Sequence, residues 1–251
     1  MLVTCYYDIY NRPEKFMDYL YLFYDLGISG IPITLFTDPC LVHKFRIFPS
    51  SVTVIGIPLA EFELYQMGMS YSRDLPNHRT PQKDTKEFFS LMNTKVEFVK
   101  KAAERWPTVD TFMWIDFGIL KIVKHTERFL EKLTDLSHRR FTKMVIPGCW
   151  SLGQSFSVEK IHWRFCGGFF VIPRNYIEPF YGHSRGVLND FCRMDFYKLT
   201  WETNVWSTIE FCSERENIVW YFADHNDTIV INIDYVLDSV VEKEAVSIDI
   251  A

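Results

Sequence analysis

Lys95 is an ionisable side chain in an otherwise apolar helical pattern. The apolar stripe of this expected helix recurs at spacings of three and four residues and consists of Phe88, Met92, Val99, Ala102 and Trp106. An unpaired ammonium there would be costly. Lys95 must therefore either reach solvent along its apolar stem or meet a fixed anion, such as a carboxylate or a diphosphate. The pattern predicts a structural ion pair or a ligand contact, and both interpretations stay open.

Glu202 is a second charged residue in apolar surroundings, since it projects between Trp206 and Ile209 on a helical arc that also contains Trp201. Burial beside indole rings raises the pKa of a carboxyl group, which suits a general base that works near neutral pH. Alternatively, Glu202 lies in the first turn of the helix, where its oxygens would meet free backbone N–H groups. The indoles also offer flat surfaces for a sugar.

Two expected strands end in acidic residues. The apolar run 112–115 is followed by Asp116 and, two residues later, by Gly118, where a divalent cation or a ribose could bind. The strand at 217–223 is followed by Asp224, His225, Asn226 and Asp227, which suit either a metal site or an ordinary turn. An acid that caps a turn is the alternative for Asp116 as well.

Two further segments depart from regular periodicity. Gly167 and Gly168 are adjacent in a strand pattern, which indicates a bulge or the close approach of another backbone or a ligand. Residues 68–83 have no apolar periodicity and carry several basic side chains, so they form either a basic lid over an anionic ligand or a plain surface loop.

The elements that position these residues alternate between strand and helix. Strands are predicted at 2–7, 32–37, 51–57, 110–117, 142–146, 165–172, 217–223 and 228–233. Helices are predicted at 13–26, 84–105, 124–136, 175–195 and 200–214. This order predicts an α/β fold with a mainly parallel sheet, helices on both faces and a mixed C-terminal half, and ligands at the carboxyl ends of the strands.

The composition excludes several classes of protein. The 251 residues are 48% hydrophobic and 24% charged, with a net charge of −5, so a long disordered segment or a cationic nucleic-acid binder is not expected. The six cysteines form no CxxC pair, and no apolar run reaches the ~18 residues of a membrane span. We expect a cytoplasmic protein without a signal peptide or transmembrane segment. Neither a nicotinamide-binding G-x-G-x-x-G after the first strand nor a phosphate-loop motif occurs.

Six segments together resemble the WlaTC/HtrL family of glycosyltransferases. In chain order they read LVTCYYDIYNR, IPITLFTD, NTKVEFVKKA, FMWIDFGI, FCGGFFVIPR and WETNVW. The resemblance covers residues 2–225. It implies a GT-A-like fold, in which an Asp-x-Asp motif after a central strand holds a divalent metal against the diphosphate of a nucleotide sugar. Asp116 matches the first acid of that motif, whereas Gly118 occupies the position of the second.

The residues described above and the resemblance together predict a set of roles. Donor contacts are expected at Thr4, Tyr6, Asp38, Lys95, Asp116 and Gly118. Acceptor contacts are expected at Gly167, Gly168, Trp201 and Trp206. Mn²⁺ or Mg²⁺ would be held by Asp116 and His225, and Glu202 would be the base, with Lys95 balancing the charge of the leaving group. We expect a single domain over 1–240, with a nucleotide-binding half at 1–118 and an acceptor half at 119–240, and a tail at 241–251.

These roles predict a transferase that moves a sugar from a nucleotide-sugar donor to a hydroxyl of a glycan or glycolipid, with divalent-metal assistance. Peripheral membrane association is left open. The alternative is a nucleotide- or glycan-binding module on the same scaffold without catalytic activity, which the missing second acid favours.

Overall fold

Strands from both halves of the chain share one sheet. The computed structural model describes residues 1–214 and 216–242. Within these residues the sheet has seven strands in the order β3-β2-β1-β4-β6-β5-β7. The strands are β1 (Leu2–Tyr6), β2 (Ile33–Thr37), β3 (Val52–Gly56), β4 (Thr111–Ile115), β5 (Met144–Gly148), β6 (Phe169–Pro173) and β7 (Ile218–Phe222). Only β6 runs antiparallel to its neighbours, β4 and β5.

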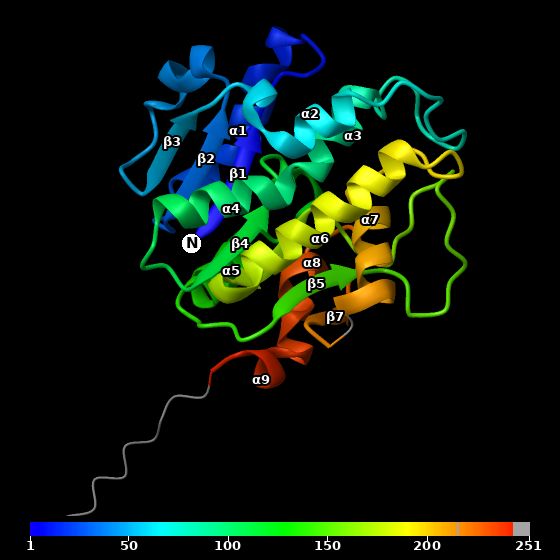
Figure 1. Cartoon of the computed structure of the whole chain (residues 1–251). Coiled ribbons are helices and arrows are strands. Elements are labelled where there is room, and N and C mark those ends of the chain that lie inside the picture. The colour runs from blue at the N-terminus through cyan, green and yellow to red at the C-terminus, as the bar shows by residue number, and fades with distance from the viewer. Residues whose placement is uncertain (215, 243–251) are drawn as a thin grey trace, which may run out of the picture.

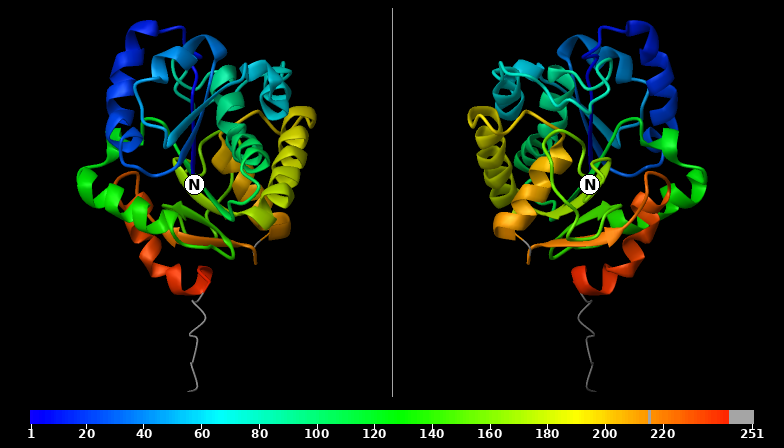
Figure 2. Two further views of the ribbon diagram at one scale, coloured as in Figure 1. Left: turned by 90° about the vertical axis from the view of Figure 1, so that its left-hand side faces the viewer. Right: turned by 90° about the vertical axis from the view of Figure 1, so that its right-hand side faces the viewer.

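Helices cover both faces of this sheet, as the two views of Figure 2 show. One layer contains α2 (Glu63–Met69), α3 (Lys86–Asn93), α4 (Lys95–Arg105), α6 (Arg174–Arg193) and α7 (Glu202–Ile209). The other contains α1 (Phe16–Gly27), α5 (Thr126–Ser137), α8 (Thr228–Ile231) and α9 (Leu237–Val240). Figure 1 labels these elements. The predicted fold class is confirmed: α/β, with a mainly parallel sheet between helices and a mixed C-terminal half.

The central strands are apolar on both sides because each face of the sheet packs on a helical layer. In β4, Phe112 and Trp114 belong to the core under α4 and α6, whereas Met113 and Ile115 belong to the core under α1 and α5. Every residue of β4 is buried. The buried strand thus fixes the point at which the chain emerges at Asp116.

Several predicted elements differ from the structure: the strand expected at 165–172, for example, begins only at Phe169. The helix expected over 84–105 is divided at Thr94, whose buried hydroxyl donates to the Ser90 carbonyl. Lys95 therefore begins a helix instead of lying in the middle of one. Phe89 and Leu91 are buried in place of the expected Phe88 and Met92.

The strand expected at 228–233 is wrong, because these residues form α8 and the start of the 3-10 helix Asn232–Tyr235. Ile229 and Ile233 are spaced four residues apart, and together with Leu237 they form a buried stripe at helical spacing. The short apolar run did not distinguish this helix from a strand.

The segment 68–83 is held against the body of the protein. Arg73 donates to the carbonyl oxygens of Phe191, Cys192 and Met194 at the end of α6. The backbone N–H groups of Asn77 and His78 donate to Glu159. These contacts favour the surface-loop interpretation of the segment.

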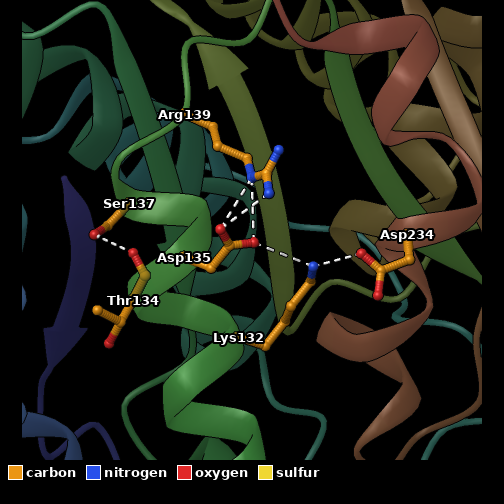
Figure 3. A network of polar contacts seen from close by, with 6 residues as sticks. All are labelled: Lys132, Thr134, Asp135, Ser137, Arg139 and Asp234. Carbon is orange, nitrogen blue, oxygen red and sulfur yellow. Dashed lines mark hydrogen bonds and ion pairs between the residues drawn. The ribbon is translucent and has the colours of Figure 1, made fainter.

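An exposed ionic network joins α5 to the C-terminal helices (Figure 3). The Lys132 ammonium lies between Asp135, at 3.3 Å, and Asp234, and Arg139 contacts the same Asp135 carboxylate at 3.0 Å. Next to it, the Ser137 hydroxyl donates to the Thr134 carbonyl at 2.7 Å. Among the described residues, no helix is both long enough and apolar enough to cross a bilayer.

Candidate active site

The order of the strands reverses at the carboxyl edge of the sheet, between β1 and β4. The chain runs outward from β1 through β2 to β3, then returns to place β4 on the other side of β1. Ligands of open α/β sheets bind at such a reversal, beyond the carboxyl ends of the two strands. Asp116, the residue that follows β4, lies at this position.

Among the described residues, one carboxylate oxygen of Asp116 is paired and the other is not. Its Oδ1 accepts from the Trp114 indole N–H at 2.9 Å and lies 2.9 Å from the Lys95 ammonium. Its backbone N–H donates to the Gly168 carbonyl. The side chain is 39% exposed, and within the described residues its Oδ2 receives no hydrogen bond. Oδ2 therefore remains available as an acceptor on a part-exposed carboxylate.

Lys95 is the buried centre of the site, with 1% of its side chain exposed. Its ammonium donates to the Gly167 carbonyl at 2.9 Å and contacts Glu202 Oε1 at 2.8 Å, in addition to Asp116. Burial alone would lower the pKa of Lys95, but the carboxylates of Asp116 and Glu202 raise it above its ordinary value. An ammonium has three N–H donors, and all three have acceptors here. Lys95 thus satisfies the predicted need for a fixed anion through carboxylates of the protein itself.

Glu202 is the first residue of α7 and is 5% exposed. It lies in the apolar surroundings expected from the sequence, but its Oε1 is paired with Lys95. A Cβ on Gly167 would lie 2.0 Å from this oxygen, so only glycine permits the approach. At Gly167, the close approach predicted for the two glycines is therefore that of a buried carboxylate. This geometry makes Glu202 a positioning residue and does not support its role as a base in contact with an acceptor.

The two indoles predicted to hold an acceptor are in the core. Trp201 packs edge-on against Phe89 at 5.0 Å between ring centroids, and Trp206 packs against Phe170 at 5.4 Å. Trp206 is 1% exposed and Trp201 is 6% exposed, so neither presents a ring face to solvent. The acceptor platform expected at these residues is therefore wrong. Gly167 and Gly168 are buried too: Gly167 admits the Glu202 carboxylate, whereas a Cβ on Gly168 would meet the side chains of Ile119 and Ile229.

The donor residues predicted on β1 and β2 have structural contacts. Thr4 is fully buried in the middle of β1, and within the described residues its hydroxyl has no partner. The Tyr6 ring packs between Phe16 and Phe117. Asp38 caps the 3-10 helix Pro39–Phe45 by accepting from the Cys40 N–H at 3.0 Å. Their donor contacts are not supported by these positions.

Two residues of the site were not predicted. Trp114 lies two residues before Asp116 on the same face of the strand, and the period of two could have identified it. Tyr19 of α1 is 42% exposed, and its ring atoms lie 3.5 Å from the position of a Cβ on Gly118. The sequence gives no local signal for this second contact, because α1 and β4 are far apart in the chain.

The residues present do not fit the divalent cation that the resemblance implies. Asp116 Oδ1 already faces an ammonium, and Gly118 supplies no second carboxylate. His225 is exposed and its ring faces Trp163 at 6.1 Å between centroids. In the part of the chain that the structure describes, no group of three or more His, Cys, Asp or Glu side chains could hold a metal ion.

Comparisons with known proteins concern the fold alone. The sequence matches no protein-family model, and no curated protein matches it. Among solved structures, a glycosyltransferase involved in the glycosylation of the major capsid of PBCV-1 is 13% identical, with a TM-score of 0.38. That likeness covers 88% of this chain and 81% of the other. The bifunctional IspDF from Campylobacter jejuni is 12% identical, with a TM-score of 0.40 over 89% of this chain and 49% of its own. The chain thus spans about half the length of IspDF.

Proposed function

We propose that the protein is a nucleotide-sugar-dependent glycosyltransferase whose donor binds at the carboxyl ends of β1 and β4. The proposal rests on the placement of Asp116 at the strand reversal, where Oδ1 is fixed by Lys95 and Trp114 and the carboxylate is 39% exposed. Pre-oriented acceptors at such a position suit the hydroxyl groups of a nucleotide's ribose or of a sugar.

The neighbouring residues support binding of the donor. Asp116 Oδ2 accepts a hydrogen bond from a hydroxyl group of the nucleotide sugar. This contact is charge-assisted, because the acceptor is a carboxylate. The exposed ring of Tyr19 next to Gly118 offers a flat face to the base or the sugar, and Gly118 has no side chain to obstruct the backbone.

Lys95 and Glu202 act through Asp116. The Lys95 ammonium neutralises one of the two carboxylates that it contacts, so the cluster as a whole carries one negative charge. This partial neutralisation reduces the repulsion between Asp116 and an anionic diphosphate. It also holds Oδ1 in place, so that the orientation of Oδ2 is set before the donor binds. The acceptor in this proposal is a hydroxyl of a glycan or glycolipid.

A non-catalytic nucleotide- or glycan-binding module is the second candidate, and the glycine at position 118 favours it. The transferase and a nucleotide-binding module would both bind a nucleotide at Asp116, but only the transferase releases a free nucleotide from a nucleotide sugar. These two candidates therefore make the same prediction for nucleotide binding and different predictions for turnover.

A thermal-shift screen with UDP, GDP, CMP and dTDP sugars tests binding, because a ligand of the native state raises the melting temperature. Each donor is measured in EDTA and in Mn²⁺, and the absence of a fitting metal site predicts the same shift in both. Release of free nucleotide from the donor that binds, with a mixed glycan acceptor pool, then tests turnover. Binding without release would support the nucleotide-binding module, and no shift with any donor would contradict both the transferase and the nucleotide-binding module.

A further inference from the structure

A pair of thiols lies next to the site. The sulfur atoms of Cys149 and Cys166 are 3.6 Å apart. Cys149 follows β5 and is partly exposed, whereas Cys166 is buried in the segment that leads into β6. Neither thiol takes part in the proposed function. Their separation is larger than that of a disulfide, which is about 2.05 Å, by about 1.5 Å.

The backbone holds the two cysteines side by side. The Cys166 N–H donates to the Pro147 carbonyl at 2.7 Å, and the Cys149 N–H donates to the Trp163 carbonyl at 3.0 Å. A Cβ on Gly148 would lie 1.8 Å from the Arg164 carbonyl oxygen, so the two segments can pack this closely only because residue 148 is glycine. The thiols meet as a consequence of this packing.

The two thiols differ in reactivity. Contact with Cys166 lowers the pKa of the Cys149 thiol, although burial and the Asp224 carboxylate act in the opposite direction. The same contact and burial raise the pKa of Cys166. Cys149 therefore has the larger thiolate fraction and the better access to solvent, which are the properties of an attacking thiol.

We propose that Cys149 and Cys166 form a reversible disulfide when the protein meets a hydroperoxide. The Cys149 thiolate attacks the peroxide oxygen, which breaks the O–O bond and gives a sulfenic acid and, with hydrogen peroxide, one water. The Cys166 thiol then attacks the sulfenic sulfur and releases a second water as the S–S bond forms. The two thiols lose two electrons, and the peroxide gains them.

The disulfide would affect the site through Gly167 and Gly168, the two residues that follow Cys166. The Gly167 carbonyl accepts from Lys95, and the Gly168 carbonyl accepts from the Asp116 N–H. Because the sulfur atoms must approach each other by about 1.5 Å, the disulfide pulls on the segment that carries both carbonyls. We expect the hydrogen bond of the Asp116 amide to weaken in the oxidised form. This inference does not depend on the proposed transferase activity.

The test is oxidation of the Cys40→Ser/Cys212→Ser protein, which lacks the two exposed thiols, by stoichiometric hydrogen peroxide. Peptide mapping should find residues 149 and 166 in one cross-linked species that has lost two hydrogens and that dithiothreitol separates. Cys149→Ser should abolish it, as should Cys166→Ala, which keeps the buried position apolar. In hydrogen exchange, the Asp116 amide should exchange faster in the oxidised protein and recover on reduction.

Three results would overturn the proposal. Oxidation of Cys149 only to sulfinic or sulfonic acid would show that Cys166 does not resolve the sulfenic acid. A disulfide between two chains would show that another thiol is the partner. A Cys149–Cys166 disulfide with unchanged exchange at Asp116 would contradict the coupling to the site.

Discussion

Two lysines of this protein each lie between two carboxylates, but in different surroundings. Lys95 is 1% exposed and contacts Asp116 and Glu202, which reach it from β4 and α7. Lys132 is 16% exposed and contacts Asp135 and Asp234, whose side chains are about half exposed (Figure 3). The same pairing of one lysine with two carboxylates thus occurs in two environments. We call the buried group of Lys95, Asp116 and Glu202 the cluster, and the solvated group of Lys132, Asp135 and Asp234 the clamp. The cluster, unlike the clamp, lies where the strand order reverses.

The largest expected effect is the loss of stability in Lys95→Met. Removing the ammonium leaves the buried Glu202 carboxylate and the part-exposed Asp116 carboxylate without their cation, which costs about 3–5 kcal/mol. Lys132→Met removes an equivalent charge at the surface and should cost at most about 1 kcal/mol. Denaturant unfolding of both variants checks the comparison. Equal losses in the two variants would contradict the distinction between cluster and clamp.

Gly167→Ala should also destabilise the protein, because its Cβ would lie 2.0 Å from Glu202 Oε1. We expect a loss of about 1–3 kcal/mol as the carboxylate is displaced from Lys95. Gly182→Ala is a matched control on α6, where an added Cβ meets nothing within 4 Å. Since alanine is the better helix former, this control should gain about 0.5–1 kcal/mol in the same melts. A neutral Gly167→Ala would show that the cluster tolerates displacement.

Glu202→Gln keeps the shape of the side chain and removes its charge. If Glu202 positions Lys95, the variant should lose about 1–3 kcal/mol of stability, and turnover should keep the acid limb of its pH profile. A general base would instead lose about 10²- to 10⁴-fold in turnover, and the acid limb would disappear. The pH profile of the variant, measured with the donor found in the screen, distinguishes these outcomes. Asp234→Asn is the equivalent change in the exposed clamp. It should change the free energy of unfolding by no more than about 0.5 kcal/mol and leave the pH profile of turnover unchanged.

The smallest expected effect is that of salt on the stability that each of the two lysines contributes. Exposed ion pairs are screened when the Debye length falls from about 10 Å at 0.1 M salt to about 3 Å at 1 M. The difference in stability between the parent and Lys132→Met should therefore vanish in 1 M NaCl. The difference for Lys95→Met should persist, because solvent ions do not reach the buried ammonium. Thermal melts at both salt concentrations provide the measurement.

Local patterns predicted the parts of the fold and site that depend on neighbouring residues. The apolar run 112–115 identified the buried strand that delivers Asp116, and the position of Lys95 among apolar residues indicated that it needs an anion. The identity of that anion was not predictable, because Glu202 is 107 residues from Lys95 and comes from another helix.

The errors have related physical causes. The break at Thr94 interrupts an apolar periodicity that continues in the sequence, and the helix at 228–231 has a short apolar run that also suits a strand. Trp201 and Trp206 were assigned to an acceptor because indoles suit sugars. Packing against Phe89 and Phe170, which only the tertiary structure reveals, places them in the core.

The most direct test of the account is calorimetric binding of the nucleotide found in the screen to Asp116→Asn. The asparagine oxygen can still accept from Lys95 and Trp114, but the charge available to the ligand is lost. A hydrogen bond to a charged group contributes about 1.5–3 kcal/mol, so the affinity should fall by about 10- to 150-fold. Asp234→Asn should bind as the parent does. Unchanged affinity in Asp116→Asn, with its fold intact by thermal melting, would contradict the placement of the donor at the carboxyl ends of β1 and β4.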